Sequence, residues 1–114
     1  MKSINKVILV GNVTRDPELK STTAGQAVCS FGLATNRVWK TDKGEKQSLA
    51  EFHNLVVWGH LAEFCGQYVT KGKPLYIEGY LKTRSWENDQ KQKLYRTEVV
   101  VEDIVLLGSS VQAE

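Results

Sequence analysis

Residues 49–84 read LAEFHNLVVWGHLAEFCGQYVTKGKPLYIEGYLKTR, and a change of hydrophobic period within them decides the fold. The first ten residues follow a period of two, which is typical of a β-strand. This period places Phe52 and Trp58, six residues apart, on one face of the strand and Leu55 and Val57 on the opposite, inward face. The stretch therefore begins with a strand over 49–58 whose outward face carries aromatic rings.

After Gly59 the apolar residues recur with helical spacing. Four of them lie at i, i+3, i+4 and i+7, on one side of a helix: Leu61, Phe64, Cys65 and Tyr68. The spacing predicts one short amphipathic helix over about 60–70, which ends before Lys71-Gly72-Lys73-Pro74 because glycine and proline stop a helix. A strand over 75–84 follows.

Three further strands are predicted outside this stretch. They cover 6–10, 26–36 and 94–107, and polar segments with turn residues join the strands: a loop after residue 10, a loop or hairpin tip over 39–47 and a loop over 86–92. Five strands with one helix between the third and the fourth indicate an all-β chain with one short helix, a five-stranded Greek-key OB-fold barrel, with another small barrel as the alternative. We expect one domain over 1–108 and a frayed C-terminal end over 109–114.

Composition excludes several classes of protein. The chain has 114 residues, of which 41% are apolar, with 15 Lys+Arg against 13 Asp+Glu. These values rule out a collagen, a coiled coil, a disulfide scaffold and a disordered tail. No apolar run is long enough for a membrane span and no signal-peptide core is visible, so we expect a soluble intracellular protein with no membrane partner. Cys29 and Cys65 are interpreted as reduced core thiols.

Positive charge is concentrated in two regions of the sequence. Residues 1–96 contain 15 basic and 9 acidic side chains, whereas residues 97–114 contain 0 and 4. The basic clusters are Arg37, Lys40, Lys43 and Lys46, and Lys82, Arg84, Lys91, Lys93 and Arg96. Such clusters are usually solvated surface, but here tryptophans lie among them.

Trp39 and Trp86 both have polar, basic neighbours, which favours exposure over burial. Trp58 ends an apolar run, but its phase with Phe52 also favours exposure. Flat rings on a sheet face among basic loops suit single-stranded nucleic acid, because each ring can stack on a base whatever the sequence while Lys and Arg attract phosphates.

Motifs for catalysis are missing from the sequence. His53 and His60 have no cysteine or carboxylate at ligand spacing, and Glu98 and Glu102 lie in phase but about 13 Å apart by strand rise. There is no GxxxxGK[ST], GxSxG or HExxH. We expect no enzyme activity, no catalytic residues, no metal site and no cofactor.

A set of motifs in order along the chain resembles the bacterial single-stranded DNA-binding protein family. The resemblance runs from about residue 4 to 108 and rests on Asn5-Lys6-Val7-Ile8-Leu9-Val10-Gly11-Asn12, Asp16-Pro17-Glu18, Leu33-Ala34-Thr35-Asn36, Glu51-Phe52-His53, Leu61-Ala62-Glu63, Lys71-Gly72, Tyr76-Ile77-Glu78-Gly79, Lys82-Thr83-Arg84-Ser85-Trp86 and Thr97-Glu98-Val99-Val100-Val101. It implies an OB-fold that assembles as a homotetramer and wraps and protects single-stranded DNA in replication, recombination and repair. The expected location is the cytoplasm, in association with the nucleoid.

The resemblance implies roles for individual residues. The stacking residues would be Trp39, Phe52, Trp58 and Trp86. His53 would lie at one subunit contact, with a satisfied core histidine as the alternative, and Tyr76 and Glu78 at a second. Phosphate contacts are expected from Lys6, Arg37, Lys40, Lys71, Lys82 and Arg84. An unpaired edge on the first strand would also need cover from another subunit.

The sequence departs from the family pattern in places. Asn54 and Ser85 stand where the family often has basic residues. Family members usually continue through a Gly/Pro/Gln-rich linker into an acidic tip that docks replication and repair enzymes, whereas this sequence stops at Glu114. Docking of such partners is therefore left open, as is the origin of the short ending. The alternative function is an OB-fold scaffold subunit of a primosome-like assembly, which would not need Trp39 and Trp86 exposed on basic loops.

Overall fold

The computed structural model describes residues 1–108, so the predicted frayed end at 109–114 lies outside the described residues. Along the chain its elements are β1 (Val7–Val13), β2 (Glu18–Ser21), β3 (Ala27–Lys40), β4 (Lys46–Trp58), α1 (His60–Tyr68), β5 (Pro74–Glu87) and β6 (Lys93–Leu106).

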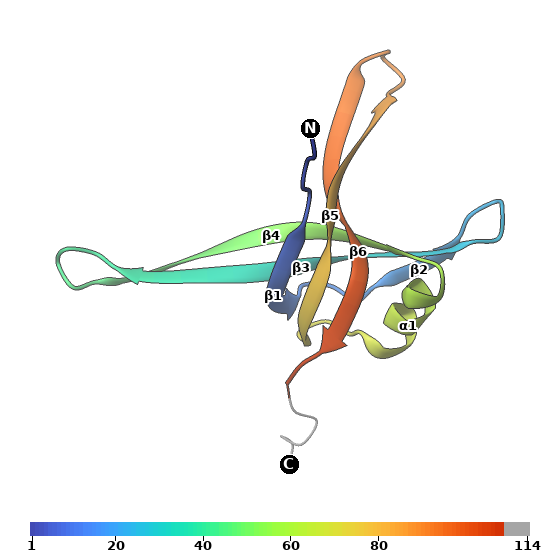
Figure 1. The fold of residues 1–114 in the computed structure, drawn as a ribbon. Coiled ribbons are helices and arrows are strands. Elements are labelled where there is room, and N and C mark those ends of the chain that lie inside the picture. Colours follow the sequence, from blue (N-terminus) through green and yellow to red (C-terminus); the bar gives the residue numbers. More distant parts are fainter. Residues whose placement is uncertain (109–114) are drawn as a thin grey trace.

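Five of the strands close into a barrel (Figure 1). Neighbouring strands follow the order β1-β5-β6-β4-β3, and β1 returns to β3 through Asn12 opposite Ala34 and Val13 opposite Leu33. All pairings are antiparallel except that of β4 with β6. The predicted all-β OB-fold barrel with one helix is confirmed.

One strand was missed by the sequence analysis. The segment after the first strand was predicted as a loop, but residues 18–21 form β2, which pairs with the start of β3. All four residues of β2 are exposed. A short strand with no buried face has no apolar alternation, so its pairing depends on β3 rather than on its own sequence.

The core is made by the inward-facing residues of the strands, as their alternation predicts. Phe31, Leu33, Leu55, Leu75 and Ile77 are fully buried. The helix α1 packs against β2, β3 and β4 and adds Ala62 and Cys65 to this core. On the predicted apolar side of α1, Tyr68 is half exposed and packs on Phe64 with ring centroids 5.1 Å apart.

Both cysteines are buried, unpaired thiols, as predicted. Cys29 and Cys65 have no solvent-exposed area. Burial raises the pKa of the Cys65 thiol to about 12, and the neighbouring Cys29 adds to the shift. Both thiols are therefore neutral parts of the core at neutral pH.

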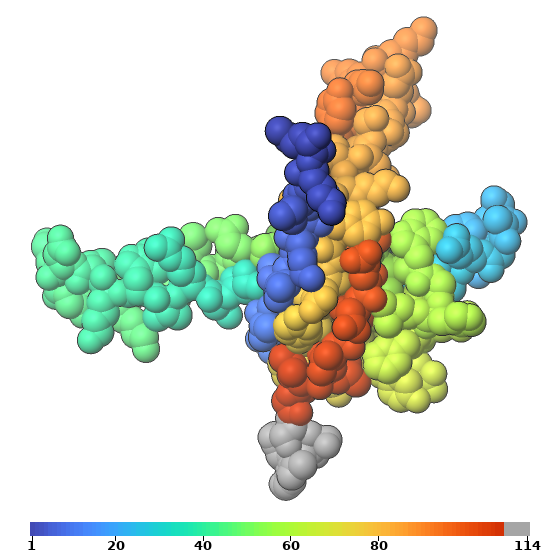
Figure 2. Space-filling model, viewed as in Figure 1, coloured from blue at the N-terminus to red at the C-terminus, as the bar shows by residue number. Residues whose placement is uncertain are grey.

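Two hairpins project from the barrel as long arms (Figures 1 and 2). For segment 39–47 we predict a loop or hairpin tip, and for segment 86–92 a loop. Both segments belong to hairpins whose strands continue into them, so that only residues 41–45 and 88–92 form the tips. Both faces of an arm meet solvent, so its strands lack the apolar alternation that marks a half-buried strand. The arms give a radius of gyration of 16.9 Å, against about 13 Å for a compact domain of this length.

A β-bulge interrupts the pairing of β5 with β6. Glu78 lies opposite Asp103 and Gly79 opposite Val101, so Glu102 is the extra residue. The inward set of β6 changes from Val99 and Val101 before the bulge to even-numbered positions after it. The alternation that places Glu98 and Glu102 in phase holds as far as the bulge, which shifts only the residues after it by one position.

Candidate nucleic-acid interface

A groove of about 360 Å³ lies on the outer face of the barrel, where four strands meet. It is lined by Ser30 of β3, Val56 and Trp58 of β4, Lys82 and Arg84 of β5, and Glu98 and Val100 of β6. These residues face outward because their strand neighbours Leu55, Val57 and Val99 occupy the core. The groove therefore combines an indole ring with cationic side chains.

The arm formed by β5 and β6, which we call the β5–β6 arm, continues the cationic surface of the groove. Lys82, Arg84 and Trp86 alternate along β5 and so share one face. The Arg84 guanidinium carbon lies 4.9 Å from the centroid of the Trp86 ring, which is a cation–π contact. The exposed ring of Trp86 thus carries a positive charge above it.

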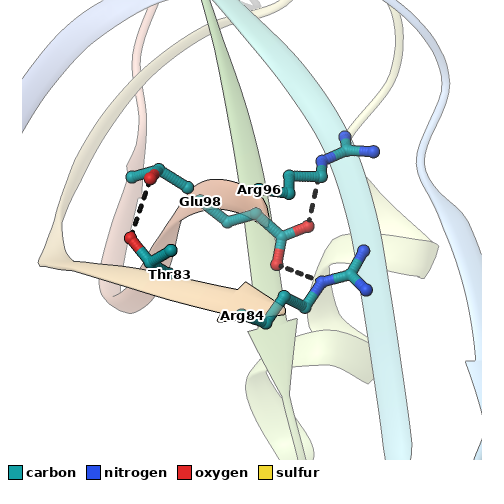
Figure 3. A network of polar contacts seen from close by, with 5 residues as sticks. Thr83, Arg84, Arg96 and Glu98 are labelled. Atoms are coloured by element: carbon teal, nitrogen blue, oxygen red, sulfur yellow. Dashed lines mark hydrogen bonds and ion pairs between the residues drawn. The ribbon is translucent and has the colours of Figure 1, made fainter. Parts of the chain in front are cut away.

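Glu98 joins two arginines on this face (Figure 3). Its Oε1 accepts a hydrogen bond from Arg84 Nε at 3.2 Å, and its Oε2 forms an ion pair with Arg96 Nε at 3.4 Å. Arg84 and Arg96 lie directly opposite each other in the β5–β6 pairing. The cluster therefore contains two positive charges around one negative charge.

The arm formed by β3 and β4, the β3–β4 arm, carries a second set of exposed rings. The Arg37 guanidinium carbon lies 5.1 Å from the Trp39 ring centroid. Phe52 is 72% exposed. In the register of this arm Phe52 shares a face with the even-numbered residues of β3, whereas Arg37 and Trp39 are odd-numbered. The rings of Trp39 and Phe52 therefore lie on opposite faces of the arm.

The four predicted stacking residues are all on the surface, and Trp58 is 42% exposed, as its phase predicted. The structure brings Trp58, Lys82 and Arg84 together in the groove and places Trp86 next to them. Trp39 and Phe52 lie on the other arm, and Lys40 ends β3 beside Trp39.

Two predicted phosphate contacts lie away from both the groove lining and the β3–β4 arm. Lys6 Nζ is 3.8 Å from Glu78 Oε1, on the β1–β5 side of the barrel. Lys71 lies in the connection from α1 to β5, where its backbone N–H donates to Asp16 Oδ1. Lys71 could not be assigned to a face from sequence, since it lies just outside the predicted helix.

Two further residues of the β5–β6 arm were not among the predicted contacts. Arg96 belongs to the basic cluster, but its partnership with Arg84 depends on the strand register. Tyr95 is 65% exposed with the Lys93 ammonium 5.8 Å from its ring centroid. In the sequence, the only indication of this pair is the alternation of Lys93 and Tyr95 within a basic segment. Both residues lie on the face of the arm opposite Arg96.

The predicted interface residues Tyr76 and Glu78 lie on the outer face of β5. The Tyr76 hydroxyl donates to Glu78 Oε2, and this hydrogen bond, followed by burial and the charges of Glu78 and Asp103, raises the pKa of Tyr76. Ile8 and Val10 of β1 lie directly opposite Glu78 and Tyr76 and are 53% and 56% exposed. The result is a partly apolar patch, which we call the β1–β5 patch.

His53 is half-buried on the inward face of β4, opposite Leu33. Its Nε2 lies 3.0 Å from Thr35 Oγ1, a hydrogen-bond distance. Within residues 1–108 no group of three His, Cys, Asp or Glu side chains could hold a metal ion. The same residues include no helix of sufficient length and apolar character to cross a membrane.

Comparison with known proteins gives consistent matches. The family model described as "Single-strand binding protein family" matches residues 4–107. A single-stranded DNA-binding protein 1 of Chlorobaculum tepidum is 44% identical over 109 residues, which cover 95% of this chain and 67% of the relative. The protein of the same name from Lactococcus lactis subsp. lactis is 47% identical over 107 residues, covering 94% and 70%.

Solved structures match the fold as well. The Plasmodium falciparum SSB complex with ssDNA superposes with a TM-score of 0.85 at 32% identity, over 95% of this chain and 98% of the other. A deletion mutant of the single-stranded DNA binding protein from Thermus aquaticus gives a TM-score of 0.80 at 29% identity, over 94% of this chain and 52% of the other.

Proposed function

The chain belongs to the single-strand binding protein family and binds single-stranded DNA, and from this premise we propose how it does so. Bases stack on Trp39, Phe52, Trp58 and Trp86 while basic side chains contact the phosphates. The observation that carries the proposal is the groove in which Trp58 adjoins Lys82 and Arg84. Its occupant needs both a flat apolar surface and negative charge, as an unpaired DNA strand has.

The arms support wrapping rather than binding at one point. Trp39 and Trp86 lie on different arms, each with an arginine over its ring. A strand that reaches both must follow the surface of the barrel between them. Their exposure also favours a DNA binder over the primosome-like scaffold, which has no use for such rings. Wrapping of this kind fits the roles in replication, recombination and repair that are typical of the family.

We further propose that the protein works by binding alone, in the cytoplasm near the nucleoid, as a homotetramer. The support for assembly is the β1–β5 patch together with the edge of β1, whose residues 7–11 have no strand partner on the side away from β5 within the described part of the chain. An exposed apolar edge strand favours pairing with a second copy, and a two-fold pairing repeated once gives D₂ symmetry.

Tryptophan fluorescence provides the test of stacking. Poly(dT) should quench the emission of the wild-type protein, and Trp86→Ala should weaken oligonucleotide binding by about 1–3 kcal/mol with the fold intact. Tyr68→Ala is the matched control, because Tyr68 is a half-exposed ring on α1, outside the basic surface. Unchanged affinity of Trp86→Ala together with lower thermal stability would show that Trp86 is structural.

A further inference from the structure

We propose that Glu98 is a positioning residue for single-stranded DNA: it holds Arg84 over Trp86 and holds Arg96 beside Arg84, so that both guanidinium groups face the strand. This inference rests on the proposed function. A carboxylate in a groove that binds a polyanion should weaken binding by repulsion. Its contacts suggest the opposite role.

Burial separates the carboxylate from the approaching phosphates. The side chain of Glu98 is 13% exposed, whereas those of Arg84 and Arg96 are 53% and 42% exposed. A phosphate arriving from solvent therefore meets the arginines first. The acid lies below them.

The contacts of Glu98 leave the phosphate-binding nitrogens available. Both arginines approach the carboxylate through Nε. The two terminal nitrogens of each guanidinium take no part in these contacts and retain the forked geometry that suits a phosphate. Glu98 thus orients both side chains without using the donors that DNA needs.

Electrostatics explains why the arginines need Glu98. Arg84 and Arg96 are directly opposite each other in register, and like charges at such positions repel. The carboxylate of Glu98 lies between their Nε atoms and offsets this repulsion. Without it, Arg84 would turn away from Arg96 and leave the Trp86 ring, 4.9 Å from which it now lies.

Removing the charge of Glu98 reduces the repulsion of phosphates but also releases the two arginines that Glu98 orients. Because these effects on affinity oppose each other, the test needs a matched control. Glu98→Gln adds one net positive charge and should steepen the slope of log affinity against log salt concentration by about 0.7. Glu87→Gln makes the same change of charge on the same arm, and Glu87 forms no ion pair within residues 1–108. The difference between the two variants isolates positioning.

Affinity for a fluorescent oligo(dT) is measured at low salt and at about 1 M salt, where the screening length falls to ~3 Å. At high salt Glu87→Gln should match the wild type, and Glu98→Gln should bind about two- to tenfold more weakly, because the freed arginine side chain must then be ordered on binding. Glu98→Asp retains the charge, but its side chain is too short to reach both arginines. This variant should therefore bind oligo(dT) more weakly than the wild type at both salt concentrations. Thermal unfolding verifies that each variant folds.

The emission of Trp86 gives a second readout. In a Trp39→Phe/Trp58→Phe background Trp86 is the only tryptophan, and Glu98→Gln should shift its emission while Glu87→Gln should not. Equal binding by Glu98→Gln and Glu87→Gln at both salt concentrations, with Glu98→Asp like the wild type, would overturn the inference. In that case, weaker DNA binding by Trp86→Ala would still support the stacking proposal. Failure of the Glu98 inference can therefore be distinguished from failure of the stacking proposal.

Discussion

Trp58 ends an apolar run yet lies on the surface, because it shares the outward face of β4 with Phe52 while Val57 points into the core. At the residue scale this parity decides which rings can meet DNA. The same alternation places Lys82, Arg84 and Trp86 on one face of β5. A substitution at one of these outward-facing positions therefore alters the proposed binding surface without disturbing the core.

Stability at alkaline pH should depend on Cys65. Burial raises the pKa of this thiol to about 12, against 9.0 for the ordinary group. Above pH 9 the unfolded chain loses a proton that the folded chain keeps. The free energy of unfolding should therefore be fully retained below pH 9 and fall by about 1.4 kcal/mol per pH unit from pH 9 towards 12.

Urea unfolding in reducing buffer measures this dependence. Cys65→Ala should show a shallower fall above pH 9, with the remainder coming from Cys29, whose pKa is also raised by burial, and from Tyr76, whose pKa is raised by its hydrogen bond to Glu78. An equally steep fall in Cys65→Ala would assign the alkaline loss to other groups.

At the scale of elements, the bulge on β6 turns the strand so that it can both close the barrel and extend into an arm. Gly79 lies at this point, opposite Val101, where the strands approach closely. A Cβ built on Gly79 would lie 2.0 Å from the Val100 carbonyl oxygen. Only glycine fits this position without movement of the backbone.

Gly79→Ala should accordingly destabilise the protein by about 1–3 kcal/mol or more, because the strands must separate to admit the methyl group. Thermal or urea unfolding measures the loss. Ser85→Ala, on the exposed part of the same strand, should change stability by less than about 0.5 kcal/mol. A Gly79→Ala variant as stable as the wild type would show that the bulge tolerates a side chain.

At the scale of the whole molecule, a small barrel extends two arms (Figure 2). It leaves the apolar residues of the β1–β5 patch open to solvent. The patch and the unpaired edge of β1 are the surfaces that a second copy would cover. Joining several barrels places their grooves at high effective concentration along one DNA strand. Wrapping is in this sense a property of the proposed assembly.

Val10→Lys should therefore reduce the mass measured by analytical ultracentrifugation at micromolar concentration, because a charge would be buried in the proposed contact. Val38→Lys is the matched control, since Val38 is 55% exposed on the β3–β4 arm. We expect the control to keep the tetramer mass. A monomer mass for the wild type would overturn both assembly and the wrapping that depends on it.

What could be derived from sequence was local. The change from a period of two to helical spacing after Gly59 indicated the barrel with one helix, and parity placed Trp58 and Leu55 on opposite faces. The motifs from Asn5 to Val101 indicated the family. These properties depend on residues a few positions apart, so they are visible in the chain itself.

Only the tertiary structure decided the features that depend on how one strand pairs with another. The pairing of β2 with β3, the length of the arms and the bulge at Glu102 each require a partner strand that the local pattern does not reveal. The same holds for Glu98, whose contact with Arg84 depends on the register between β5 and β6. Alternation determines the face of a residue, whereas the register between paired strands determines its neighbours across the sheet.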